Sequence, residues 1–125
     1  SKRAAEIYNM EVLHENIEDN TENYTRFLEI RLEPVIPDNN AKTSIVFTLK
    51  NQPGALYRAL SVFAEHDIDL TKIESRPLVG KPWEYLFYMD FICPGGKGSA
   101  QNALDQLKKY ALMLRLLGSY PRFQA

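Results

Sequence analysis

The chain has 125 residues, of which 45% are hydrophobic, and its formal net charge at pH 7 is -1. This composition allows a core of ordinary size, in one domain or in one small domain with an appendage. The near-neutral charge excludes strong electrostatic attraction to nucleic acid or an anionic membrane, the apolar runs are too short to cross a bilayer, and a single cysteine allows no internal disulfide. We therefore expect a cytoplasmic protein with no nucleic-acid or membrane partner.

The sequence pattern of residues 1–33 indicates that they are the remnant of another domain. Ser1–Tyr8 reads as the last turns of a helix already under way, which suggests a piece of a longer protein. Apolar and polar residues alternate over Glu11–Ile17 and Thr25–Leu32, which predicts two strands joined by the turn-rich segment Glu18–Asn23. Two strands and a short helix cannot bury a core, so this segment needs the rest of some other domain.

A linker and a regular domain follow. Residues 34–43 contain two prolines and an Asp-Asn-Asn cluster without periodicity, which predicts a linker. Residues 44–121 then form regular elements. Ser44–Lys50 alternates and predicts a strand, and Ala55–Glu65 predicts a helix. The apolar stripe expected for that helix consists of Leu56, Leu60, Phe63 and Ala64.

The second half of this domain predicts two strands, a helix and a last strand. Leu70–Pro77 and Trp83–Cys93 are the strands, and the turn Leu78–Pro82 between them places Gly80 where a positive φ is allowed. After the loop Pro94–Gly98, Ser99 is the expected N-cap of a helix that ends near Tyr110. The buried side of that helix is expected to be Ala103, Leu104 and Leu107. The last strand is Leu112–Tyr120, with a bulge or close approach at Gly118.

The order of these elements predicts the fold. Strand, helix, strand, strand, helix, strand is the βαββαβ order of an α+β, ferredoxin-like fold, with a four-stranded antiparallel sheet and two helices on one face. Such sheets occur in enzymes, RNA-binding domains and sensors, so the function has to come from particular residues. An RNA platform made from the aromatic strand is not favoured, because the chain lacks the accompanying basic residues.

The junction between the first strand and the first helix is a candidate binding site. In Asn51–Leu56, Pro53 fixes a turn and Gly54 lets a ligand or a partner chain approach the backbone. The free N–H groups of the first helical turn favour an anion such as a carboxylate. A plain strand-to-helix turn explains the same residues. Because Gly54 is expected to open the helix, replacing it with valine is expected to cost only about 0.5–1 kcal/mol.

A second candidate lies at the end of the second strand. Glu74 and Ser75, in the segment Glu74–Pro77, offer a carboxylate and a hydroxyl that could hold the charged groups of an amino acid. A solvated strand edge, protected from pairing by its proline, is the competing interpretation.

Taken together, these segments resemble a known regulatory domain. Gly54-Ala55-Leu56, Leu70–Pro77 and Trp83–Phe87 are similar to the ACT domain of prephenate dehydratases, in which a "GAL(V)" and an "ESRP" motif mark the phenylalanine site. Tyr57 replaces the usual valine, and aromatic amino acid hydroxylases carry a related domain. The resemblance implies that L-phenylalanine is bound at the interface of an ACT homodimer and causes feedback inhibition. The ligand-binding residues that it implies are Asn51, Gly54, Ala55, Leu56, Glu74 and Ser75.

The upstream segment resembles the end of the dehydratase catalytic domain. Its Thr-Arg-Phe motif implies that Thr25 is catalytic in the full-length parent, which converts prephenate to phenylpyruvate, while Arg26 is equally explained as a solvated side chain. Most of the catalytic domain is missing, so the fragment itself is expected to be inactive. No cofactor or metal is implied, since His14 and His66 have no ligand spacing around them. A parent that uses arogenate, and a dimerisation module without a ligand, remain alternatives.

Overall fold

The structure is a computed structural model that describes residues 1–20, 22, 25–35, 41–92 and 96–122, without the side chains of Pro82, Gly96 and Lys97. The chain divides into two compact units, Ser1–Arg31 and Leu32–Ala125. Within the described ranges, every helix is too short or too polar to cross a bilayer.

The described residues of the first unit contain one short helix. Helix α1 (Lys2–Tyr8) begins after Ser1, whose Oγ accepts a hydrogen bond from the Ala4 N–H at 3.3 Å. It ends at Asn9, which has a left-handed conformation with φ 50°. The expected helix at the start of the chain is confirmed.

The two strands predicted in this unit are wrong for this chain. Glu11–Ile17 and the described part of the second segment, Thr25–Leu32, have no regular secondary structure. Their apolar side chains stay in solvent; Leu13 and Phe27, for example, are 81% and 85% exposed. The physical reason is that a strand needs a paired neighbour and a face to bury, and the described residues of this unit supply neither.

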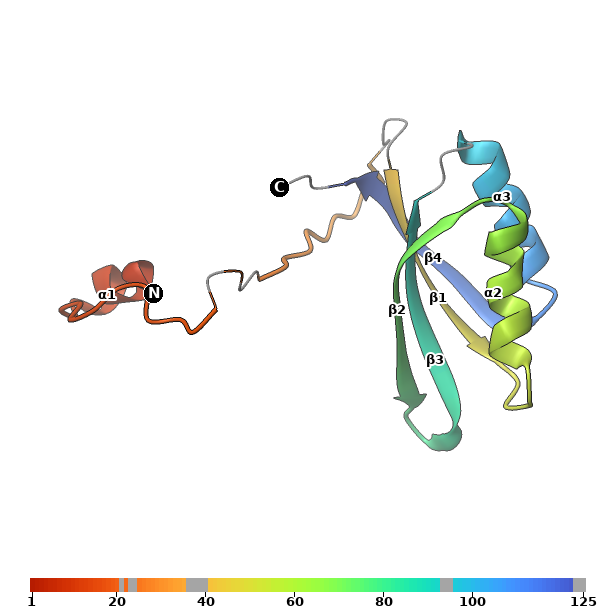
Figure 1. The fold of residues 1–125 in the computed structure, drawn as a ribbon, viewed down its shortest axis with the longest axis horizontal. Coiled ribbons are helices and arrows are strands. Elements are labelled where there is room, and N and C mark those ends of the chain that lie inside the picture. Colours follow the sequence, from red (N-terminus) through yellow and green to blue (C-terminus); the bar gives the residue numbers. More distant parts are fainter. Residues whose placement is uncertain (21, 23–24, 36–40, 93–95, 123–125) are drawn as a thin grey trace. The chain divides into compact units, whose positions relative to one another are not determined.

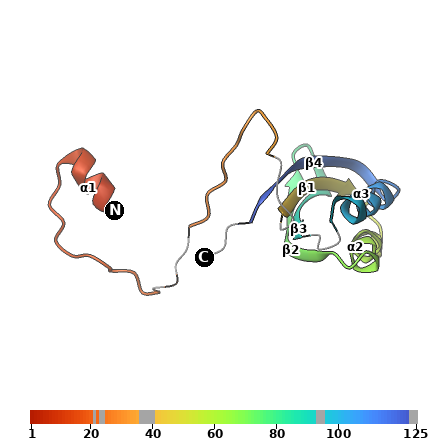
Figure 2. The same ribbon diagram turned by 90° about the horizontal axis from the view of Figure 1, so that it is seen from above.

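The second unit has the predicted fold. Its elements are β1 (Ala41–Leu49), α2 (Ala55–Glu65), β2 (Asp69–Leu78), β3 (Lys81–Ile92), α3 (Gly96–Leu107) and β4 (Ala111–Pro121). The sheet is antiparallel throughout, with strand order β2-β3-β1-β4. Helices α2 and α3 cover one of its faces (Figures 1 and 2). The expected α+β arrangement is confirmed.

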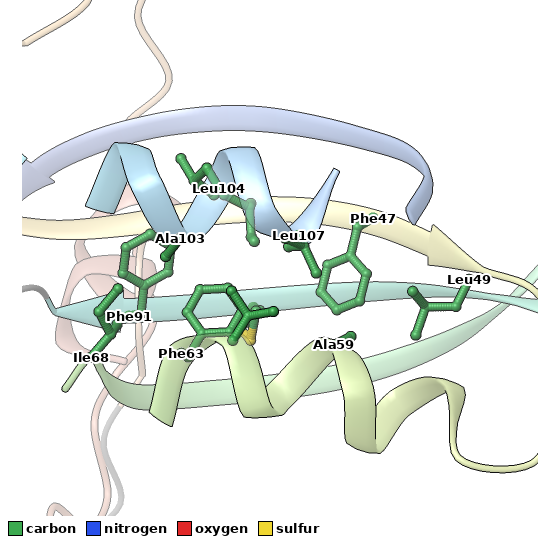
Figure 3. Close-up of a cluster of buried hydrophobic side chains, with 12 residues drawn as sticks. Phe47, Leu49, Ala59, Phe63, Ile68, Phe91, Ala103, Leu104 and Leu107 are labelled. Atoms are coloured by element: carbon green, nitrogen blue, oxygen red, sulfur yellow. The ribbon is translucent and has the colours of Figure 1, made fainter. Parts of the chain in front are cut away.

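The core lies between this face and the two helices. Phe47 from β1, Phe63 from α2 and Phe91 from β3 are fully buried, and the rings of Phe63 and Phe91 pack at 5.4 Å between centroids (Figure 3). The predicted buried side of α3 is confirmed, since Ala103, Leu104 and Leu107 belong to the same cluster.

Helix α2 is rotated relative to the stripe that the sequence predicts. Of the predicted stripe, Phe63 is buried and Leu60 packs against the core, but Leu56 and Ala64 are exposed. The other buried residues of the helix are Ala59 and Val62. The small side chain of Ala59 is fully buried against the sheet side of the helix, and Leu56, at the start of the helix, is left at the edge of the core.

Two predictions about α3 are wrong. Ser99 is not its N-cap, because the helix already begins at Gly96; the Ser99 hydroxyl instead donates to the backbone oxygen of His66 at 3.3 Å. The helix also ends at Leu107 rather than near Tyr110, and a turn connects it to β4.

Two glycines mark irregular positions in the sheet, one in a turn and one at a register shift. Gly80 has φ 82° in the tight connection between β2 and β3, where Leu78 pairs with Lys81. The pairing of β1 with β4 shifts register beside Gly118, because Ser44 pairs with Gly118 and the next residue, Ile45, pairs with Leu116. The predicted bulge at Gly118 is confirmed. Cys93, predicted to end the third strand, lies outside the described residues.

The face of the sheet without helices contains a buried polar network. Asp90 on β3 is 5% exposed, and its Oδ1 accepts a hydrogen bond from Ser44 Oγ on β1 at 2.6 Å. Because this bond uses the only hydroxyl proton of Ser44, the Tyr120 hydroxyl on β4, 2.7 Å away, donates to Ser44. Lys42 Nζ lies 3.8 Å from the other carboxylate oxygen of Asp90. The network ties three strands together at the end of the sheet where β1 begins.

Candidate ligand-binding site

A cavity of about 110 Å³ lies where β1 leads into α2, at the junction that the sequence singles out. It opens to solvent and borders the edge of the core. Its wall consists of Leu49, Lys50, Asn51, Gln52, Ala55, Leu56, Tyr85 and Phe87. Three of the predicted ligand-binding residues, Asn51, Ala55 and Leu56, therefore contribute to one cavity.

The turn before α2 is fixed by backbone hydrogen bonds. The Gln52 N–H donates to the Lys50 oxygen at 2.9 Å, and the Ala55 N–H donates to the Gln52 oxygen at 3.1 Å. The Arg58 N–H donates to the Gly54 oxygen at 3.0 Å and closes the first helical turn. The N–H groups of Leu56 and Tyr57 thus have no acceptor within the helix and remain available to an anionic group.

Gly54 is the N-cap of α2, directly before its first helical residue Ala55, as the predicted helix bounds imply. It makes no side-chain cap hydrogen bond, and its φ of 75° lies in the left-handed region. A Cβ at this position would lie 2.9 Å from Nη1 of Arg58, whose Nη2 donates to the Pro53 oxygen at 3.3 Å. The expected small cost of valine at position 54 is therefore wrong, because a β-branched residue is strained at this φ.

Strand β3 supplies the aromatic wall of the cavity. Phe87 is half-buried and stacks on Phe47 of the core, with 5.3 Å between ring centroids and 21° between ring planes. Tyr85, two residues earlier on the same face, is 42% exposed. The stacking holds Phe87 in place, so the cavity has a rigid aromatic side.

The second predicted motif divides between the two faces of the sheet. Ser75 pairs with Phe87 in the β2–β3 register and so lies on the face of the cavity. Glu74 pairs with Tyr88 and lies on the opposite face, because side chains alternate along a strand. Within one chain, Glu74 therefore does not point toward the cavity.

Glu74 is engaged with two cations on its own strand. Lys72 Nζ lies 3.1 Å from its Oε2, and the Arg76 Nε donates to its Oε1 at 2.6 Å. The hydrogen bond from Lys72, followed by that from Arg76, lowers the pKa of the Glu74 carboxyl below its usual value of 4.5. This carboxylate stays charged and lies between two cationic side chains on the face of the sheet opposite the cavity.

Thr25 belongs to the other unit and is exposed. Sequence reasoning also missed part of the cavity wall, namely Leu49, Lys50, Gln52, Tyr85 and Phe87. The available signal was periodicity: Tyr85 and Phe87 share the alternation of the core residues Met89 and Phe91, so they face the side of the sheet on which α2 begins.

Comparison with known proteins identifies two families along the chain. Residues 43–112 match the ACT domain family, and residues 1–35 match the prephenate dehydratase family. Arogenate dehydratase/prephenate dehydratase 2 of Arabidopsis thaliana is 48% identical over 132 residues, covering 97% of this chain and 35% of the relative. The bifunctional chorismate mutase/prephenate dehydratase of Aquifex aeolicus is 45% identical over 122 residues, covering 98% and 34%.

A solved structure shares the fold. The prephenate dehydratase of Arthrobacter aurescens in complex with L-Phe is 32% identical with a TM-score of 0.64, covering 72% of this chain and 30% of that one. The chain spans about a third of the length of these relatives. It therefore belongs to the ACT domain family and, with a prephenate dehydratase segment before that domain, has the arrangement found in prephenate and arogenate dehydratases.

Proposed function

We propose that this chain is the L-phenylalanine-binding regulatory part of a prephenate dehydratase and carries its feedback inhibition. The observation that carries the proposal is the cavity, which has apolar and aromatic walls and lies beside the first turn of α2. The bound L-Phe of the Arthrobacter aurescens relative supports the choice of ligand. Apolar cavities of about 150 Å³ hold one benzene molecule, so a phenyl ring is expected to fill this cavity of about 110 Å³ and to extend through its opening to solvent.

The ligand is expected to enter ring first. Its phenyl group packs against Phe87 and Leu56, and its carboxylate meets the N–H groups of Leu56 and Tyr57. Ser75 lies outside the cavity wall but on the same face of the sheet as Phe87, and its hydroxyl is expected to contact the ligand beside that ring. An aromatic amino acid would thus be bound through three kinds of contact: apolar side chains at its ring, N–H groups at its carboxylate and a hydroxyl.

The role of Glu74 requires a second copy of the chain. Because Glu74 points away from the cavity of its own chain, a contact with the ligand's ammonium must come from the β2 strand of a partner. We propose that two ACT domains pair so that each cavity faces the partner's β2. Phenylalanine then favours one arrangement of the dimer, and the attached catalytic domain is less active in that arrangement.

The proposed division into domains keeps the sequence prediction, with a catalytic remnant over 1–33, a linker over 34–43 and the ACT domain over 44–121. In the complete parent, Thr25 acts in the conversion of prephenate to phenylpyruvate by protonating or orienting the departing hydroxyl. Arogenate is the alternative substrate, and the names of the Arabidopsis relatives include both activities. The cytoplasm stays the proposed compartment, although the name of the Arabidopsis relative places that enzyme in the chloroplast.

Titration calorimetry of this chain tests the proposal. L-Phenylalanine is expected to bind and to raise the melting temperature, with D-phenylalanine and L-tyrosine weaker. A dimerisation module without a ligand predicts no heat from any of the three at millimolar concentration. That result would replace the sensor proposal with the interaction module.

A further inference from the structure

The cavity beside α2 has one charged side chain in its wall. Of its eight lining residues, only Lys50 carries a formal charge at neutral pH. Lys50 follows the last residue of β1 directly, belongs to the cavity wall and is exposed, while Phe87 and Leu56 form apolar parts of the wall. The cavity thus joins an aromatic surface to a single cation.

The charge of Lys50 is not used elsewhere in the described part of the chain. Two other lysines of the same unit are paired, Lys72 with Glu74 at 3.1 Å and Lys108 with Asp105 at 2.7 Å. Within the ranges that the structure describes, Lys50 makes neither an ion pair nor a side-chain hydrogen bond. The ammonium can therefore meet a ligand without first breaking an internal contact.

We infer that Lys50 determines the specificity of this site by selecting ligands that carry a carboxylate next to a single aromatic ring. The inference rests on the proposed function and extends it to a residue outside both motifs. With the ring against Phe87, the polar end of a small aromatic ligand lies at the rim, where Lys50 attracts a carboxylate and repels an ammonium. Lys50 therefore also fixes the direction of a zwitterion, turning its ammonium away from the end of β1.

The test compares two ligands across matched variants. L-Phenylalanine and L-phenylalaninamide share the ring and the ammonium at about pH 6, below the ordinary pKa of an α-amino group, and differ in the carboxylate. The 125-residue chain is titrated with each ligand as the unsubstituted protein and as Lys50→Gln, Lys50→Arg and Lys50→Glu. Lys108→Gln is the control, because it also removes an exposed lysine of the same unit but lies outside the cavity wall.

The unsubstituted chain is expected to prefer phenylalanine to its amide. Lys50→Gln lowers that preference about three- to tenfold, the range of one exposed charge-assisted contact. Lys50→Arg keeps the preference, Lys50→Glu lowers it further, and Lys108→Gln leaves it unchanged. The difference between unsubstituted protein and Lys50→Gln also shrinks at about 1 M salt, because the charge is exposed.

Two results overturn the inference and separate it from the proposed function. If the unsubstituted chain binds phenylalanine and Lys50→Gln keeps the full preference over the amide, the specificity role of Lys50 is wrong and the sensor function stands. If the unsubstituted chain binds neither ligand, the sensor function and the inference fail together. Because Lys50 is exposed, the melting temperature of each unliganded variant should match that of the unsubstituted protein.

Discussion

Replacing Gly54 with alanine should separate the binding role of the turn from its backbone geometry. Gly54 has φ 75°, and a left-handed conformation costs an L-residue roughly 1–2 kcal/mol. The added Cβ would also lie 2.9 Å from Nη1 of Arg58, but this is the end of a flexible side chain and can move. We therefore expect Gly54→Ala to destabilise the chain by about 1–2 kcal/mol and to lower its melting temperature by roughly 4–16 °C.

Gly80 provides the matched control. Its φ is 82°, close to that of Gly54, and a Cβ there would meet no described atom within 4 Å. Gly80→Ala should thus carry the same backbone strain, but in the β2–β3 turn and away from the cavity wall. Equal losses of stability in the two variants would show that strain accounts for the folding effect.

The two variants should differ in ligand binding. Tilting the backbone at position 54 moves the N–H groups of Leu56 and Tyr57, and one charge-assisted hydrogen bond is worth about 1.5–3 kcal/mol. Gly54→Ala should therefore weaken phenylalanine binding at least about tenfold by calorimetry, whereas Gly80→Ala changes it less than about twofold. The reasoning fails if folded Gly54→Ala protein binds phenylalanine as tightly as the Gly80→Ala protein does.

The other predictions concern the ligand, the activity and the charges of β2. L-Tyrosine should bind about fivefold or more weakly than L-phenylalanine in calorimetry, because a buried hydroxyl without a partner costs roughly 1–3 kcal/mol. Mixed with prephenate, this chain should form no phenylpyruvate above background in an absorbance assay, since Thr25 is exposed and the chain spans only about a third of the length of its relatives; measurable turnover would contradict this. In an NMR titration, Lys72→Met and Arg76→Met should each raise the pKa of Glu74 toward its usual value of 4.5, because each variant removes a hydrogen bond and a positive charge that lower it. The pKa of Glu74 is lower in the folded chain than in the unfolded chain, so Glu74 stabilises the fold fully above pH 4.5 and loses this contribution as the pH falls through its folded-state pKa. If the stability difference between the unsubstituted chain and Glu74→Gln does not change with pH, this stabilising role is wrong.

The order of the elements could be predicted because each strand or helix of the second unit carries its own periodicity. Ala55–Glu65 was predicted with the boundaries that α2 has, since Asn51–Gly54 breaks the pattern before it and His66-Asp67 breaks it after. The strands Glu11–Ile17 and Thr25–Leu32 failed under the same rule. Alternation predicts which face a strand would bury, but whether a strand forms depends on a neighbour.

The candidate site likewise has a part that the sequence predicts and a part that depends on strand pairing. Asn51, Ala55 and Leu56 are close in sequence, so their common position at the cavity followed from the local turn. Their partners Tyr85 and Phe87 are about thirty positions away, and only the pairing of β1 with β3 brings them to the same place. The opposite orientation of Glu74 and Ser75 also depends on the β2–β3 register, which places Ser75 beside Phe87.

The sequence by itself therefore determined the βαββαβ order, the turn at Gly54 and the apolar side of α3, because each of these depends on residues within one or two turns of one another. Only the tertiary structure decided which face of α2 is buried and that Lys50 is the one charged residue in the cavity wall. These features depend on distances between segments that are far apart in the chain. Such distances are set by the packing of the helices on the sheet, which no local pattern of residues encodes.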